Sequence, residues 1–185
     1  MSFVESDRLE KIIQGCLRKK RKSQKQLYEL YYRFGFATCR RYARNTEEAE
    51  EMVNNGFLKL FLNIDKYDPN LKFESWARRV FINVAIDYYR KYANDFTGDH
   101  LDLDNTTVML PVVKPEILEK LSNGVILKCV AQLPPSYRIA FNLSVVEGYS
   151  HPEIAEILQI SVGSSKSNLS KARAKLKTIL AELYA

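Results

Sequence analysis

The stretch that most restricts the fold is "EGYSHPEIAEILQISVGSSKSNLSKARAKLKTIL", because it carries start signals for two helices only a few residues apart. Ser150 and Glu153 have the spacing of a capping box, in which the two residues satisfy each other's free backbone N–H groups. Pro152 is tolerated in the first turn of a helix. Ser161 is a suitable cap for a second helix. A short helix, a tight turn and a longer basic helix together predict a helix-turn-helix.

The two helices of this motif have distinct inner and outer faces. The inner faces are expected to hold Ile154, Ala155 and Leu158 on the first helix, and Val162, Leu169, Ala172, Leu176 and Ile179 on the second. Near its start the second helix presents short polar or basic side chains that can reach base edges and phosphates. These candidate DNA-binding residues are Lys166, Ser167, Asn168, Ser170 and Lys171. The alternative is a plain helical hairpin whose lysines are solvated.

The chain is basic overall, but its charge is unevenly spread. The net charge is +6 and the isoelectric point about 9.1, which permits a polyanionic partner. Residues 1–92 carry +7, residues 93–124 carry −4 and residues 125–185 carry +3. The three cysteines, Cys16, Cys39 and Cys129, are far apart, so they suggest neither a disulfide framework nor a zinc site. Two basic blocks therefore flank an acidic connector.

Almost every other periodic segment is predicted to be helical. Helices are expected near 7–17, 24–44, 46–64, 73–92, 116–132 and 136–147, with a basic loop at 18–25. In 46–64, Thr46 can cap the helix, and Gly56 lies in its interior, where glycine costs about 1 kcal/mol relative to alanine. Its expected apolar stripe is Ala49, Met52, Val53, Phe57, Leu60, Phe61 and Ile64.

From Asn94 onward the periodicity fades, and residues 94–115 are predicted to form a flexible, extended acidic linker. The expected fold class is all-α, with two small helical domains and no strand. The predicted boundaries are 1–93 for the first domain, 94–115 for the linker and 116–185 for the helix-turn-helix domain.

The segment "FESWARRVFINVAIDYYRKY", residues 73–92, combines aromatic rings with cations. One face of the predicted helix is ordinary core: Phe73, Ala77, Val80, Phe81, Val84 and Tyr88. A second strip holds Trp76, Arg79, Asn83, Asp87 and Arg90. Cations hold phosphates, and an aromatic platform can replace base stacking worth about 1–3 kcal/mol per base. We therefore expect Trp76, Arg79, Asn83 and Arg90 to bind unstacked DNA; the alternative is a surface tryptophan among solvated arginines.

The predicted helix at 46–64 also has a second face, opposite its core stripe. Two leucines on an otherwise polar face suggest a docking surface for another protein. The alternative is that a neighbouring helix of the same domain covers them. This face comprises Glu51, Asn54, Asn55, Leu58 and Leu62.

Two parts of the chain resemble one protein family. "LPPSYRIAFNLSVVEGYSHPEIAEILQISVGSSKSNLSKARAKL" is similar to region 4 of bacterial RNA polymerase sigma factors of the extracytoplasmic-function (ECF) group. "EEAEEMVNNGFLKLF" and "FESWARRVFINVAIDYYRK" resemble region 2 of that group. The resemblance implies an alternative sigma factor that binds core RNA polymerase, with region 2 melting the minus-10 promoter element and region 4 reading the duplex minus-35 element.

The same resemblance implies roles for other segments. The face at Leu58 and Leu62 would bind the clamp coiled coil of the polymerase's largest subunit, and the acidic linker would pass through the polymerase's positively charged channels. An anti-sigma factor is a further partner that the sequence leaves open.

Catalytic motifs are absent from the sequence, so we expect no enzyme activity, no cofactor and no metal site. No apolar run is long enough to span a membrane and no signal-peptide core is present, so we expect a cytoplasmic protein. The main alternative is a stand-alone helix-turn-helix transcriptional regulator that binds duplex DNA without the polymerase.

Overall fold

The computed structural model describes residues 3–92 and 123–184. It contains two compact units, Met1–Ala85 and Ile86–Ala185. Every regular element among the described residues is a helix. The all-α prediction is thus confirmed, whereas the predicted linker at 94–115 lies outside the described residues.

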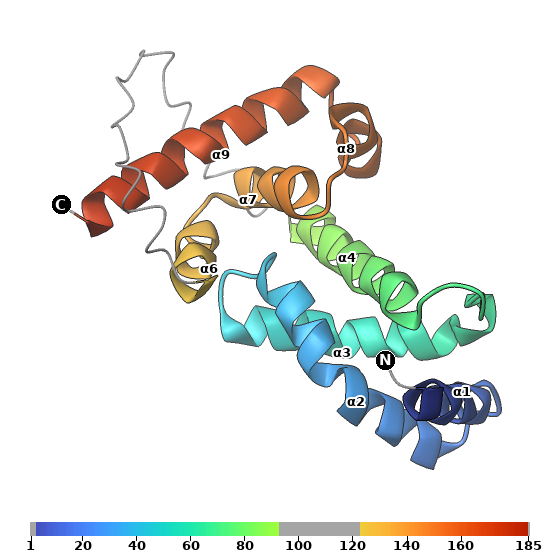
Figure 1. Cartoon of the computed structure of the whole chain (residues 1–185). Helices are drawn as coiled ribbons and strands as arrows, with labels where there is room; N and C mark the ends of the chain where they lie inside the picture. Colours follow the sequence, from blue (N-terminus) through green and yellow to red (C-terminus); the bar gives the residue numbers. More distant parts are fainter. Residues whose placement is uncertain (1–2, 93–122, 185) are drawn as a thin grey trace. The chain divides into compact units, whose positions relative to one another are not determined.

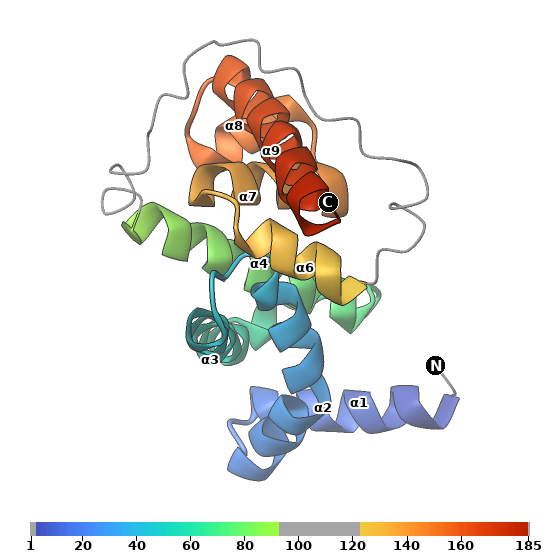
Figure 2. The same ribbon diagram turned by 90° about the vertical axis from the view of Figure 1, so that its left-hand side faces the viewer.

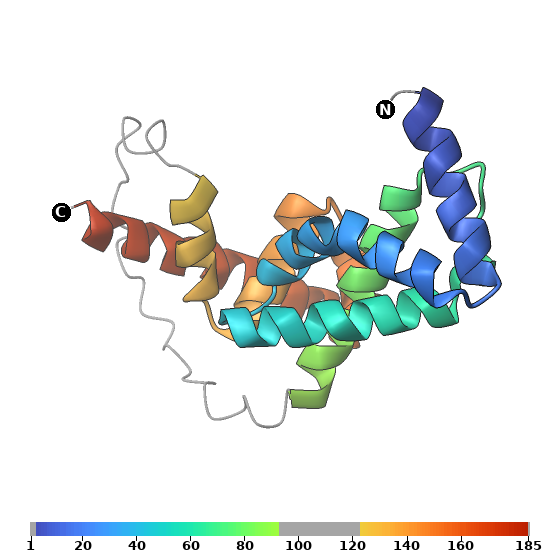
Figure 3. The same ribbon diagram turned by 90° about the horizontal axis from the view of Figure 1, so that it is seen from below.

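The first unit is a helical bundle (Figure 1). Helix α2 lies along α3, and α1 packs against α2 after a short turn, as Figure 3 shows. A short 3-10 helix, η1, follows α3 and precedes the loop that leads into α4. The boundary between the units falls within α4. The bounds are α1 Phe3–Leu17, α2 Arg21–Arg40, α3 Thr46–Leu62, η1 Ile64–Lys66 and α4 Phe73–Tyr92.

The Phe81 ring of α4 is the point at which α2, α3 and α4 meet. It is fully buried and makes an edge contact with Phe57 at 5.4 Å between ring centroids. Gly35 of α2 and Gly56 of α3 both face this ring. A β-carbon at Gly35 would lie 2.6 Å from the nearest Phe81 ring atom, and one at Gly56 would lie 2.3 Å away. Since real β-carbons do not approach atoms this closely, both glycines are required for the three helices to pack at this distance.

Two local expectations for the first unit were wrong. Asn45, not Thr46, caps α3, and its side-chain oxygen accepts a hydrogen bond from the Glu48 N–H at 2.8 Å. Asn ranks above Thr as an N-cap, so cap preference itself favours Asn45 over its neighbour Thr46. The basic run at 18–25 is also mostly helical, because α2 begins at Arg21.

The second unit contains a helix-turn-helix and the helices that support it (Figure 2). Helices α7 and α8 pack against the long α9. Val130, Leu133 and Ala172 form a buried cluster, and Tyr137, Phe141 and Leu176 pack against it. The bounds are α6 Asn123–Ala131, α7 Pro135–Phe141, the π-helix η3 Asn142–Val146, α8 His151–Leu158 and α9 Val162–Leu183.

Within this unit, the helix predicted at 136–147 is divided into α7 and the π-helix η3. A buried arginine ties α7 to the helix before it. Arg138 is 3% exposed, and its guanidinium donates to the backbone carbonyl of Ala131 at 2.8 Å. A buried cation of this kind is retained only when it is hydrogen-bonded, so Arg138 fixes the α6–α7 corner.

Candidate nucleic-acid interface

The capping box predicted at the start of α8 is present. The Ser150 N–H and hydroxyl donate to Glu153 Oε2 at 2.8 and 2.6 Å, and the Glu153 N–H donates back to Ser150 Oγ at 3.5 Å. The side-chain and backbone hydrogen bonds from Ser150 lower the pKa of the Glu153 carboxyl below its usual value. The box therefore fixes where α8 begins.

The turn between α8 and α9 is equally well defined. Gln159 adopts the left-handed conformation with φ of 56° and ends α8. Ser161 then caps α9, because its hydroxyl accepts from the Ser164 N–H at 2.9 Å. These features confirm the predicted helix-turn-helix.

The polar start of α9 is open to solvent. Lys166, Ser167, Ser170 and Lys171 are exposed and Asn168 is half-buried. On the opposite side Leu169, Ala172 and Ile179 are buried as predicted, and Leu176 is partly buried. Val162 is a correction: it is 39% exposed rather than inward. It is the first residue of the helix, where the chain has not yet reached the packed face.

The buried position near the start of α9 belongs instead to Ser165, which is fully inaccessible. Its hydroxyl lies 3.0 Å from Nδ1 of His151, the first residue of α8. The sequence patterns did not reveal this link between the two helices. Ser165 has no apolar side chain to mark it as buried, so the periodicity of α9 could not reveal it.

On α4, the predicted strip lies along the outer face of the helix. Arg79, Asn83 and Arg90 are exposed, and Arg90 lies 3.8 Å from Asp87. Trp76 is half-buried. Its ring contacts Tyr67 and Phe73 at centroid distances of 5.4 and 5.6 Å.

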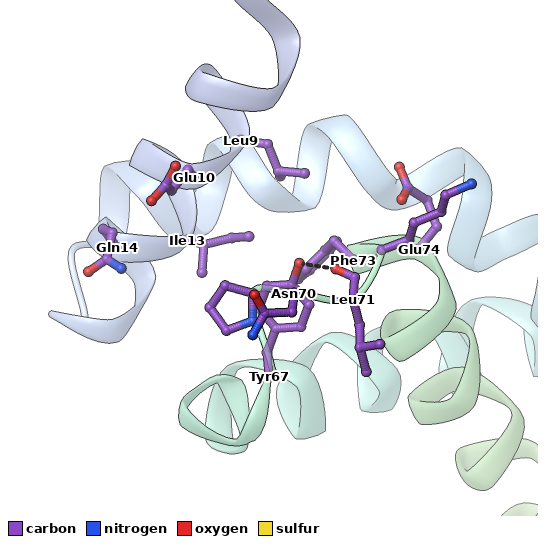
Figure 4. A pocket seen from close by; sticks show the side chains of 11 residues that line it. Leu9, Glu10, Ile13, Gln14, Tyr67, Asn70, Leu71, Phe73 and Glu74 are labelled. Atoms are coloured by element: carbon purple, nitrogen blue, oxygen red, sulfur yellow. Dashed lines mark hydrogen bonds between the residues drawn. The ribbon is translucent and has the colours of Figure 1, made fainter. Parts of the chain in front are cut away.

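Beside this aromatic cluster is a hollow of about 850 Å³, shown in Figure 4. Leu9 and Ile13 of α1 line one side, and Tyr67, Leu71 and Phe73 line the other. The Tyr67 hydroxyl donates to the Leu71 carbonyl at 2.7 Å, which holds the loop before α4 in a closed turn. An open hollow with a mixed apolar and polar lining therefore adjoins the rings that support Trp76.

The outer face of α3 carries the two leucines singled out in the sequence. Leu58 is 57% exposed and Leu62 is 70% exposed. Glu51, Asn54 and Asn55 are exposed on the same face, and Asn54 accepts a hydrogen bond of 3.3 Å from the Tyr28 hydroxyl. No helix of the first unit covers the two leucines among the residues described.

The described part of the chain shows no metal site, no activated cysteine at position 16 or 39 and no membrane-spanning helix. No group of three or more His, Cys, Asp or Glu side chains there could hold a metal ion. Burial raises the pKa of the Cys16 thiol to about 11 and that of Cys39 to about 12, so neither is a ready nucleophile. Of the described helices, none is long and apolar enough to cross a membrane.

Comparison with known proteins places both units in one family. The family model for Sigma-70 region 2 matches residues 27–94, and the model for Sigma-70, region 4 matches residues 124–176. The first range contains the α3 face and the α4 strip, and the second contains the helix-turn-helix.

Individual relatives match across both regions. ECF RNA polymerase sigma factor SigW of Bacillus subtilis (strain 168) is 31% identical over 157 residues, covering 80% of this chain and 83% of the relative. SigM of the same strain is 28% identical over 157 residues, covering 83% and 93%. The sigma factor RpoE in its co-crystal structure with the anti-sigma factor NepR from Bartonella quintana shares the fold. Its TM-score is 0.50 and its identity 20%, over 85% of this chain and 96% of that one. The chain therefore belongs to the ECF family of RNA polymerase sigma factors.

Proposed function

We propose that this ECF sigma factor binds core RNA polymerase through α3, contacts melted minus-10 DNA through α4 and reads the duplex minus-35 element through α9. As a member of the family, the chain directs transcription initiation. The observation that carries the division of labour is that three solvent-facing surfaces of different chemistry coexist in one small chain. One is apolar, one is aromatic and cationic, and one is short, polar and basic.

The start of α9 suits duplex DNA. A helix presented by a helix-turn-helix enters the major groove with the residues near its N-terminus toward the bases. Asn168 can pair with adenine, and the serines can bond either base edges or phosphates. Lys166 and Lys171 add phosphate contacts, each of which increases the salt dependence of binding.

The α4 strip suits DNA whose bases have left the stack. Extruding a base costs a few kcal/mol, which a pocket and a stacking surface can offset. Trp76 supplies an aromatic surface already supported by Tyr67 and Phe73. The adjoining hollow offers room for an extruded base, while Arg79 and Arg90 reach the backbone.

The exposed α3 face suits a protein partner. Leu58 and Leu62 present an apolar centre, and Glu51, Asn54 and Asn55 form a polar surround, the usual layout of a protein interface. We propose that the partner is the polymerase, with residues 1–93 and 116–185 as the two functional domains and 94–115 as their linker. The protein would then act in the cytoplasm, and no catalytic step of its own is needed.

The test is reconstitution with core RNA polymerase. Addition of the purified chain should make the core initiate at a specific promoter, and Leu58→Ala/Leu62→Ala should lower its affinity for the core without unfolding it. Exposed Leu30, which is 54% accessible on α2, provides a matched control as Leu30→Ala. If the chain instead bound promoter duplex specifically on its own and left the core inactive, the stand-alone regulator would be the correct function.

A further inference from the structure

The turn between α1 and α2 carries an unusual concentration of positive charge. Residues 18–22 are five consecutive cations, and all five side chains are exposed. We call these residues, Arg18, Lys19, Lys20, Arg21 and Lys22, the basic turn.

No carboxylate of the described residues pairs with the basic turn. The described carboxylates of this unit that form ion pairs lie elsewhere: Asp7 pairs with Lys11, Glu29 with Lys25 and Glu48 with Arg44. Within the described residues, none of the five side chains of the turn has a hydrogen-bond or ion-pair partner. Five neighbouring like charges repel one another, and no described carboxylate offsets this repulsion.

Two of the five charges also oppose the dipole of the helix in which they lie. Arg21 and Lys22 occupy the first turn of α2, which contains no acidic residue, and Lys20 makes no side-chain cap. Cations at the positive end of a helix dipole are unfavourable. An unfavourable placement of charge that nothing in the described fold compensates indicates that these cations are retained for binding.

The composition of the basic turn identifies the kind of partner. Three of the five cations are lysines, which are depleted in protein interfaces, whereas a DNA backbone binds clustered cations through their charge and requires no fixed geometry. We propose that the basic turn contacts the phosphate backbone of promoter DNA without reading its sequence. The inference rests on the proposed function, and it adds a DNA contact outside the α4 strip and the helix-turn-helix.

The experiment measures how the affinity of the reconstituted holoenzyme for a promoter duplex changes with salt. Each phosphate contact contributes about 0.9 to the slope of log affinity against log salt. Lys20→Gln/Lys22→Gln should reduce that slope by up to about 1.8 and leave both promoter choice and affinity for the core unchanged. The control, Lys66→Gln/Lys128→Gln, removes the same charge from two other exposed positions and should not change the slope.

The outcomes separate the possible partners. If the unsubstituted chain directs initiation normally but Lys20→Gln/Lys22→Gln leaves the salt slope unchanged, this inference is overturned and the proposed function stands. Loss of affinity for the core polymerase at an unchanged slope would assign the basic turn to a protein partner and would also overturn it. If the unsubstituted chain fails to make the core polymerase initiate, both the proposed function and this inference are overturned. Thermal unfolding of each variant establishes that the comparison is between folded proteins.

Discussion

The effect of replacing Gly56 on stability depends on the Phe81 ring, which faces it. Helix propensity alone predicts that Gly56→Ala stabilises α3 by about 1 kcal/mol. The new methyl would instead meet two Phe81 ring atoms at 2.3 and 2.5 Å. Overpacking of this kind costs about 1–3 kcal/mol, so we expect Gly56→Ala to be destabilising in denaturant titration.

Gly163→Ala is the matched control for this prediction. A β-carbon there meets only Ser161 Oγ at 3.6 Å, an ordinary contact. The substitution should therefore raise stability by up to about 1 kcal/mol. If both alanine variants were stabilised alike, the close packing of α3 on Phe81 would be wrong.

Trp76 has one side against the core and the other toward solvent, so its removal affects both stability and DNA opening. Loss of a stacking partner costs about 1–3 kcal/mol, which slows opening roughly fivefold to more than a hundredfold. Trp76→Ala should show this defect per folded molecule in a promoter-opening assay, and it should be only partly rescued by a pre-melted minus-10 segment. Trp76→Phe, which keeps an aromatic surface, should retain more activity.

Phe73→Ala shows what the loss of a purely structural ring does, and so separates the stabilising role of Trp76 from its proposed role in DNA binding. Phe73 is 2% exposed, so its removal should lower stability by about 3–5 kcal/mol through the cavity it leaves. If Trp76→Ala were destabilised as much as Phe73→Ala yet opened DNA normally per folded molecule, Trp76 would be a core residue and not a DNA platform.

At the scale of elements, the hydrogen bond between His151 and Ser165 joins α8 to α9. A neutral hydrogen bond contributes about 0.5–1.5 kcal/mol to stability. His151→Phe and Ser165→Ala should therefore be less than additive by about that amount in a double-mutant cycle. Exposed Ser167→Ala should be additive with His151→Phe, and coupling of equal size in both pairs would argue against a specific bond.

The capping box of α8 predicts a pH dependence. The folded-state pKa of Glu153 is depressed, so the ionised carboxylate stabilises the folded protein. This stabilisation is complete above the unfolded-state pKa of about 4.3, and it is lost as the pH falls through the lower folded-state pKa. Glu153→Gln should remove this part of the acid dependence, as measured by thermal unfolding of the helix-turn-helix unit between about pH 5 and pH 2. An identical acid profile in the variant would mean that the carboxylate is not what stabilises the cap.

For the whole molecule, the charge blocks and the fading periodicity predict two domains joined at 94–115. Limited proteolysis should cut first within that segment and release two resistant fragments, because a polar sequence without an apolar face is a preferred cleavage site. Early cleavage inside α3, whose backbone is protected by packing against α2, would contradict the domain assignment.

The sequence by itself determined the all-helical fold class, the helix-turn-helix and its caps, and the exposed faces of α3 and α4. These properties depend on hydrophobic periodicity and on hydrogen bonds between near neighbours, both of which are local. Only the tertiary structure decided the need for Gly35 and Gly56, the burial of Ser165 against His151, and the partial burial of Trp76. Each depends on a side chain contributed by another element, and periodicity identifies the face that is buried but not the group that packs against it.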